Sequence, residues 1–183
     1  MDSEKLKVLQ DLSRKIYLKN KNFVFDIVLF GSSVKGKTKP EDIDIAVIFS
    51  SKLSQNNINK ILSHFKGFHA EYIFLGELYR ETLWPTILQE GYSLIHSEFI
   101  YKILGFGSSF LFMYGLKGLN NVSKSRFSHA LFGRAEKEGL LFEVGGKQIG
   151  RGCISVPVEN SEKIRSFFET WKISYSVYKA LMA

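Results

Sequence analysis

Residues 29–33 read Leu-Phe-Gly-Ser-Ser, and residues 42–45 read Asp-Ile-Asp-Ile. The apolar run before Gly31 predicts a buried strand that ends in a tight turn, where a glycine lets a ligand approach the backbone closely. The free N–H groups and hydroxyls of such a turn suit phosphate oxygens. On the following strand, successive side chains point to opposite faces. Asp42 and Asp44 are therefore expected on one face, and Ile43 and Ile45 on the face toward the core.

Two neighbouring carboxylates repel each other unless a cation compensates them. Mg²⁺ is the natural candidate, because it takes oxygen ligands and is usually shared between carboxylates and a substrate phosphate. Mn²⁺ is the alternative ion. The strand–turn–strand pattern therefore predicts a joint site for a metal ion and a phosphate group. The alternative interpretation is an exposed strand edge beside an ordinary turn.

This pattern resembles the nucleotidyltransferase superfamily that includes DNA polymerase beta, and it is most similar to the small minimal nucleotidyltransferases. Their signature, an apolar residue, Gly-Ser, about ten residues and Asp-x-Asp, appears here with nine residues between Ser32 and Asp42. The third carboxylate of the family corresponds to Glu71, with glutamate in place of aspartate. The common ending of the family corresponds to residues 87–94, so that the resemblance covers about residues 5–98.

The resemblance implies an enzyme that transfers a nucleoside monophosphate from an NTP, with ATP expected first, to an acceptor hydroxyl of RNA or protein. It implies two Mg²⁺ ions, and the residues expected both to hold them and to be catalytic are Asp42, Asp44 and Glu71. The residues expected to bind the nucleotide are Gly31, Ser32, Ser33 and Lys35. The alternative is a non-catalytic module of the same fold that binds RNA or a partner protein, as antitoxin-type relatives do.

Two further residues near this stretch have structural interpretations. Asp26 lies in the buried strand, and we expect a structural aspartate whose hydrogen bonds are satisfied. His69 is two residues before Glu71 and shares its face on the predicted strand. We expect it to be a packing residue, and the alternative is a role in supporting the catalytic acids.

The charge of the chain is distributed unevenly. The 183 residues carry a net charge of +7, but residues 1–98 hold 13 Lys and Arg against 12 Asp and Glu, whereas residues 99–183 hold 12 against 6. We expect a catalytic domain over 1–98 and a basic, aromatic-rich α+β domain over 99–183 that contacts an acceptor or nucleic acid. The cations expected to contact nucleic acid are Lys124, Arg126, Arg134, Lys147 and Arg151. Alternatively, the basic surface only keeps the protein soluble.

Hydrophobic periodicity predicts an α+β (α/β) fold, in which a small mixed β-sheet with helices is followed by a second small α+β lobe. In the first half it predicts helices and strands in the order helix 3–19, strand 23–30, polar loop 34–41, strand 43–49, helix 56–65, strand 69–75, helix 83–89 and strand 92–96. In the second half it predicts a helix over 123–138, a hairpin of 140–144 with 148–158, a helix over 164–171 and a strand over 173–178. Residues 104–116 show no clear period.

Composition excludes several protein classes. The apolar share of 45% and the charged share of 23% are typical of a globular chain, and the single cysteine excludes an intrachain disulfide framework or a zinc site of several cysteines. The polar, acidic start predicts no secretory signal, and the most apolar stretch, residues 104–116, is too short to span a membrane. We expect a cytoplasmic protein without membrane contact.

Overall fold

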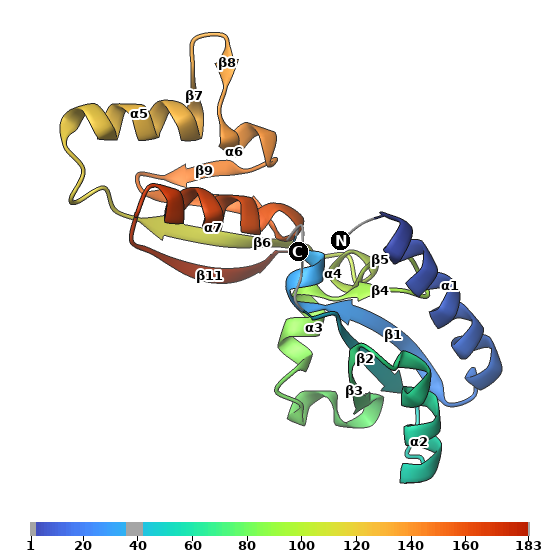
Figure 1. Ribbon diagram of the computed structural model, residues 1–183. Helices are drawn as coiled ribbons and strands as arrows, with labels where there is room; N and C mark the ends of the chain where they lie inside the picture. Colours follow the sequence, from blue (N-terminus) through green and yellow to red (C-terminus); the bar gives the residue numbers. More distant parts are fainter. Residues whose placement is uncertain (1–2, 36–41, 183) are drawn as a thin grey trace. The chain divides into compact units, whose positions relative to one another are not determined.

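The computed structural model describes residues 3–35 and 42–182 of the chain. The chain forms two compact units, each with its own β-sheet; the first ends at Phe106 and the second runs from Gly107 to Met182 (Figure 1). The mixture of helices with mixed and antiparallel sheets confirms the predicted α+β class. The division into domains at residue 98 stays a prediction, and in the structure the short helix α4 (Ile100–Ile103) groups with the first unit.

The sheet of the first unit has the order β3-β2-β1-β4-β5. Its strands are β1 (Val24–Phe30), β2 (Asp44–Phe49), β3 (His69–Phe74), β4 (Tyr92–Ser93) and β5 (Glu98–Phe99). β2 and β3 run parallel, whereas the other neighbouring pairs are antiparallel, so the sheet is mixed as predicted. The central strands β1 and β2 are almost wholly buried, which explains their unbroken apolar sequences.

Helices cover both faces of this sheet. α1 (Ser3–Asn20), α2 (Gln55–Leu62) and the short helix η2 (Ser63–Phe65) enclose one core with alternate residues of β2, namely Ile45, Val47 and Phe49. The intervening residues of β2, Ala46 and Ile48, form a second core with α3 (Trp84–Glu90), α4 and η3 (Leu75–Arg80). The predicted elements of this half are confirmed, although the predicted fourth strand shortens to the two residues of β4. Most of the predicted polar loop lies outside the described residues.

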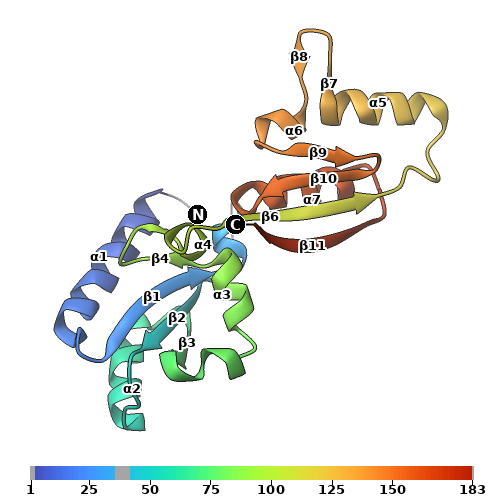
Figure 2. The same ribbon diagram turned by 180° about the vertical axis from the view of Figure 1, so that it is seen from behind.

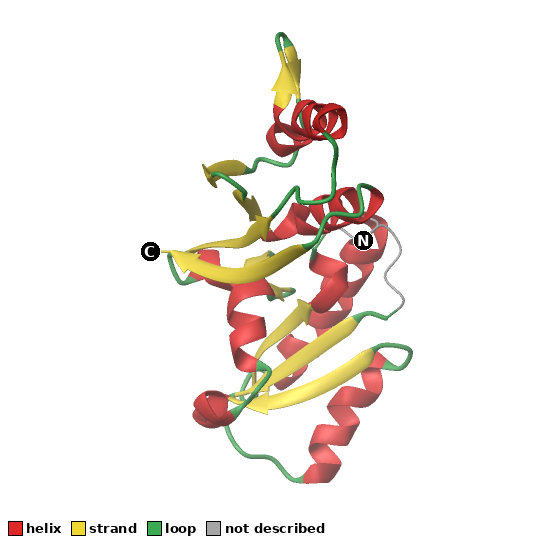
Figure 3. Cartoon of the chain, turned by 90° about the vertical axis from the view of Figure 1, so that its left-hand side faces the viewer, coloured by secondary structure: helices red, strands yellow, loops and turns green. Residues whose placement is uncertain are grey.

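The second unit has an antiparallel sheet of order β11-β6-β10-β9. In chain order its main elements are β6 (Gly107–Tyr114), α5 (Asn121–Phe132), β9 (Lys147–Gly150), β10 (Cys153–Pro157), α7 (Ser161–Thr170) and β11 (Tyr175–Met182). This succession and strand order are the βαββαβ pattern of ferredoxin-like folds. The core joins Phe127 and Leu131 of α5 and Ile164 and Phe168 of α7 to one face of the sheet, and Figures 2 and 3 show this unit from two further sides.

The predicted helix over 123–138 is wrong in its second half. α5 ends at Phe132, and a small hairpin of β7 (Gly133–Arg134) and β8 (Lys137–Glu138) follows. Gly133 has φ +90°, and a side chain there would overlap the backbone carbonyl of Lys137. With ψ 177° the backbone at Gly133 is not helical, and glycine is the residue that adopts this combination of angles readily.

The predicted hairpin of 140–144 with 148–158 is also wrong. Leu140–Glu143 forms the short helix α6, and the hairpin is instead made by β9 and β10 around Arg151 and Gly152. A five-residue apolar run does not distinguish a buried helical turn from a strand. Residues 104–116, which had no clear period, contain β6; Ser108, Ser109 and Phe110 are buried in succession, which obscures the alternation.

In the described ranges, 3–35 and 42–182, no helix has the length and apolar character needed to cross a bilayer.

Candidate active site

The glycine-serine turn lies directly beside Asp44. The short helix η1 (Gly31–Val34) follows β1, and the last residue of β1, Phe30, pairs with Asp44 at the start of β2. Gly31 has φ +75°, and a Cβ atom at this position would overlap Oδ2 of Asp44. Both observations require glycine, which alone adopts this conformation readily and leaves room for the carboxylate.

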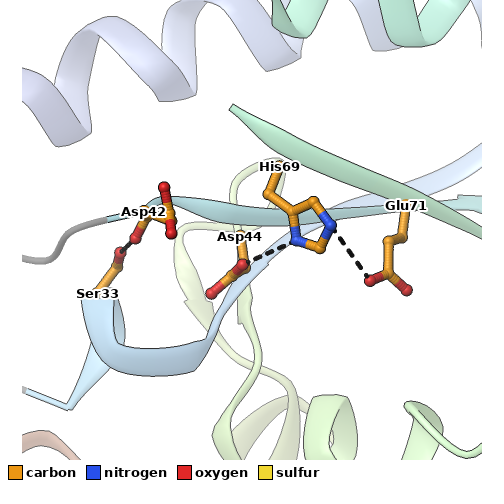
Figure 4. Close-up of polar contacts among 5 residues, drawn as sticks. All are labelled: Ser33, Asp42, Asp44, His69 and Glu71. Carbon is orange, nitrogen blue, oxygen red and sulfur yellow. Dashed lines mark hydrogen bonds and ion pairs between the residues drawn. The ribbon is translucent and has the colours of Figure 1, made fainter. Parts of the chain in front are cut away.

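Ser33 connects the same turn to Asp42. Its side chain is buried, and its hydroxyl donates a long hydrogen bond of 3.4 Å to the backbone carbonyl of Asp42 (Figure 4). Asp42 is exposed, while the Asp44 side chain is 24% exposed. The turn therefore contacts the backbone of Asp42 and the carboxylate of Asp44.

His69 lies between two of the predicted catalytic carboxylates. It is opposite Asp44 in the parallel pairing of β2 with β3, and Glu71 follows on the same face of β3. The imidazole Nδ1 is 3.1 Å from Oδ1 of Asp44, and Nε2 is 3.8 Å from Oε1 of Glu71 (Figure 4). The prediction that His69 is a packing residue is wrong, since its side chain is 63% exposed and contacts both acids.

The donor set has the chemistry that Mg²⁺ requires. Asp42, Asp44 and Glu71 offer only carboxylate oxygens, the preferred ligands of this ion. Across the residues that the structure describes, however, no group of three or more His, Cys, Asp or Glu side chains is arranged to hold a metal ion. The assignment of these three acids as metal ligands therefore stays a prediction, and what the structure adds is the histidine between Asp44 and Glu71.

A comparison with protein families identifies this region. Residues 14–98 match the family model described as polymerase beta, nucleotidyltransferase. This region is therefore similar to the nucleotidyltransferases of the polymerase beta family. The matched range includes the glycine-serine turn and all three predicted carboxylates, whereas the second unit lies outside it. No curated protein and no solved structure matches the chain.

The matched region contains a buried acid that is not among the predicted site residues. Glu90, the last residue of α3, has a fully buried side chain, and its Oε2 lies 2.8 Å from Nζ of Lys35. Lys35 directly follows η1, so this ion pair joins the glycine-serine turn to α3. A buried carboxylate is stable only with such compensation. The signal for Glu90 was present in the family-like ending of residues 87–94, where it precedes Gly91.

Asp26 in β1 is a structural residue, as predicted. Its Oδ1 accepts hydrogen bonds from the hydroxyl of Ser93, at 2.8 Å, and from the backbone N–H of Ile27, at 2.7 Å. Burial raises the pKa of the Asp26 carboxyl above its ordinary value, although both hydrogen bonds act in the opposite direction.

The cations predicted to contact nucleic acid do not lie together. Lys124 and Arg151 line one hollow of the second unit, whereas Arg134 lines another. Arg126 and Lys147 are exposed on α5 and β9. Whether any of the five contacts nucleic acid stays a prediction.

Proposed function

We propose that the chain is a metal-dependent nucleotidyltransferase that transfers a nucleoside monophosphate from an NTP, ATP first among them, to an acceptor hydroxyl of RNA or protein. The observation that carries this proposal is the contact of the Gly31 backbone with the Asp44 carboxylate. It supports the proposal because a turn that suits phosphate oxygens and an acid that suits a divalent cation lie side by side.

In this proposal Asp42, Asp44 and Glu71 are the catalytic acids that would hold two Mg²⁺ ions. When bound, these ions would lower the pKa of the attacking hydroxyl and neutralise charge on the leaving pyrophosphate. The chain itself contributes mainly the placement of charge, which is the principal requirement of phosphoryl-type transfer.

The residues of the turn would bind the triphosphate. Gly31 gives the phosphates close access to backbone N–H groups, and Ser32 and Ser33 add hydroxyls. Lys35 would add positive charge beside the phosphates, while its ion pair with Glu90 holds the turn against α3.

His69 is a positioning residue in this proposal. One ring nitrogen contacts Asp44 and the other approaches Glu71, so that the imidazole limits the rotation of both carboxylates. A closely held side chain loses less conformational freedom when a ligand binds.

The second candidate is a non-catalytic module of the same fold that binds RNA or a partner protein. The observation that favours it is the same His69, because its imidazole contacts both Asp44 and Glu71 and so gives the two acids a partner from the chain itself.

Incubation with each α-labelled NTP and Mg²⁺, with RNA and protein acceptors, separates the two candidates. The proposal predicts labelled acceptor with the natural chain and at least a 100-fold lower rate for Asp42→Asn and Asp44→Asn. Glu136→Gln, an exposed acid of the second unit, is the matched control and should retain the rate. Absence of transfer from every NTP, together with unchanged RNA or protein binding by the two aspartate variants, would favour the binding module.

A further inference from the structure

Three connections of the second unit meet at one end of its sheet. They are residues 115–120 between β6 and α5, residues 151–152 between β9 and β10, and residues 171–174 between α7 and β11. Tyr114, the last residue of β6, pairs with Tyr175 and donates its backbone N–H to the carbonyl of Gly152 at 2.8 Å. Figures 1 and 2 show the three connections together at the end where α5 begins.

Each of these connections carries a cation. Lys117, Arg151 and Lys124, the last from the first turn of α5, line a hollow of about 670 Å³. Lys117 also lines an adjoining hollow of about 570 Å³ together with Lys172. The two hollows share Gly115, Leu116 and Lys117 and therefore adjoin each other, and we refer to them together as the depression.

The positive charge of this depression is uncompensated. Its lining, among the residues that the structure describes, includes no aspartate or glutamate. Over the same described ranges, none of Lys117, Lys124 and Arg151 forms an ion pair. α5, twelve residues long, begins at this end, and the positive end of its dipole adds to the field of the lysines and arginine.

A third hollow, at the other end of α5, provides an internal contrast. It has about 720 Å³ and is lined by Arg134 and Lys137, but also by Glu136, Glu138 and Glu143. The cations there are balanced by acids, so size alone does not distinguish the two regions. Lys124 and Arg151 therefore lie in a hollow without acids, whereas Arg134 lies among glutamates. The sequence alone does not reveal this difference.

Aromatic rings lie beside the uncompensated cations. Tyr114 and Phe132 line the first hollow, and Trp171 lines the second. The rings of Tyr114 and Trp171 also pack against Phe127 in the core, so each is only partly accessible. Phe132 is 37% exposed and therefore offers a ring to a ligand. Cations that meet phosphates, together with rings that stack on bases, are the combination by which proteins bind single strands. Hollows of this volume accept groups of nucleotide size, whereas a duplex presents its bases only inside a rigid rod.

From these observations we infer that the second unit binds a single strand of nucleic acid in the depression lined by Lys117, Lys124, Arg151 and Lys172. The strand's phosphates meet the cations, and its bases meet the rings. The inference deepens the proposed function and rests on it in one respect, since the bound strand is the acceptor of nucleotidyl transfer.

Fluorescence anisotropy with the full chain, without NTP or Mg²⁺, tests the inference. The probes are labelled 12-mers of oligouridylate and oligodeoxythymidylate, a 12-base-pair DNA duplex and a 12-residue polyglutamate. The test variant is Lys117→Glu/Arg151→Glu, and the matched control is Lys137→Glu/Lys163→Glu, which changes the net charge equally at exposed positions outside the depression. Circular dichroism melting checks that both variants fold, and any test variant that fails to fold is replaced by Lys117→Gln/Arg151→Gln.

The inference predicts that a single-stranded probe binds more tightly than the duplex and polyglutamate, with an affinity that falls as salt rises. The test variant loses at least tenfold in affinity and its salt dependence weakens, by about 0.7 in logarithmic slope for each lost phosphate contact. The affinity of the control variant for the single-stranded probe changes less than threefold. A preference for oligouridylate identifies RNA as the strand, and a preference for oligodeoxythymidylate identifies DNA.

Equal losses in the two variants, no loss in the test variant, or binding of duplex or polyglutamate as tight as that of the single strands would overturn the inference. The Asp44→Asn variant distinguishes a failure of the strand site from a failure of the proposed enzymatic activity. If that variant and the natural chain bind the strand equally while neither transfers a nucleotide, the proposed enzyme fails and the strand site stands.

Discussion

A Cβ atom on Gly31 would overlap the Oδ2 oxygen of Asp44. The turn that follows β1 and the first residue of β2 are therefore in van der Waals contact. This contact places a turn suited to phosphate oxygens beside a carboxylate suited to a cation, and it links residues that are thirteen positions apart in the sequence.

Replacement of Gly31 by alanine tests this contact. Alanine would have to adopt φ +75° and displace the Asp44 carboxylate, so we expect a loss of about 1–3 kcal/mol in the free energy of unfolding and a loss of NTP binding. Gly76→Ala is the control, because a Cβ atom there meets no atom within 4 Å. Urea unfolding and equilibrium NTP binding measure the two effects, and equal behaviour of the two variants would contradict the contact.

The ion pair of Lys35 with Glu90 should contribute to the stability of the turn. Lys35→Met removes a cation from a fully buried carboxylate, and we expect a loss of about 2–4 kcal/mol. Glu90→Gln should lower the free energy of unfolding by less than Lys35→Met does. The double variant should be more stable than Lys35→Met alone, because it no longer contains the buried carboxylate charge. A double-mutant cycle from urea unfolding measures the coupling. A coupling energy near zero would show that the two side chains act independently.

Asp26 should make stability depend on pH in a defined direction. Burial raises the pKa of Asp26 in the folded chain. As pH rises, the Asp26 carboxyl therefore ionises at a lower pH in the unfolded chain, where its ordinary pKa is 3.8. The contribution of Asp26 to stability is therefore greatest below that pH and falls as pH rises toward the folded pKa. An asparagine side chain at this position could still accept both hydrogen bonds at its Oδ1 but cannot ionise.

We therefore expect Asp26→Asn to gain stability relative to the natural chain as pH rises from about 4, by at most about 1.4 kcal/mol per pH unit. Urea unfolding from pH 4 to 7 measures the difference, and Asp11→Asn, an exposed acid of α1, is the control and should show no such trend. A difference between natural chain and Asp26→Asn that stays constant over this range would contradict the buried environment of Asp26.

The first unit could be predicted from sequence because its signals are local. The apolar run before Gly31 and the alternation of Asp42 and Asp44 with isoleucines each indicate a strand, and the glycine indicates the turn between them. The contact of His69 with Asp44 could not be derived in this way, because it depends on the parallel pairing of β2 with β3. The partner of Lys35 was equally hidden, since Glu90 lies 55 residues away on α3.

The second unit was harder to predict because glycines decide its turns. Gly133 ends α5 early, and Gly152, with φ +73°, shapes the turn between β9 and β10 instead of the Gly145-Gly146 pair. Whether a glycine ends a helix or forms a hairpin depends on contacts with distant backbone, such as the Tyr114 carbonyl beside Gly152. Its basic residues likewise indicated a net charge but not the grouping of Lys117 with Arg151.

The most direct test of the central claim is the Mg²⁺-dependent transfer of a labelled nucleoside monophosphate, measured with the natural chain and with Asp44→Asn. The account predicts transfer that requires Mg²⁺ or Mn²⁺ and falls at least 100-fold in the variant, while Glu136→Gln retains it. Transfer that persists at the natural rate in Asp44→Asn, or that proceeds equally in EDTA, would contradict the claim that Asp44 beside the Gly31 turn forms a metal-dependent active site.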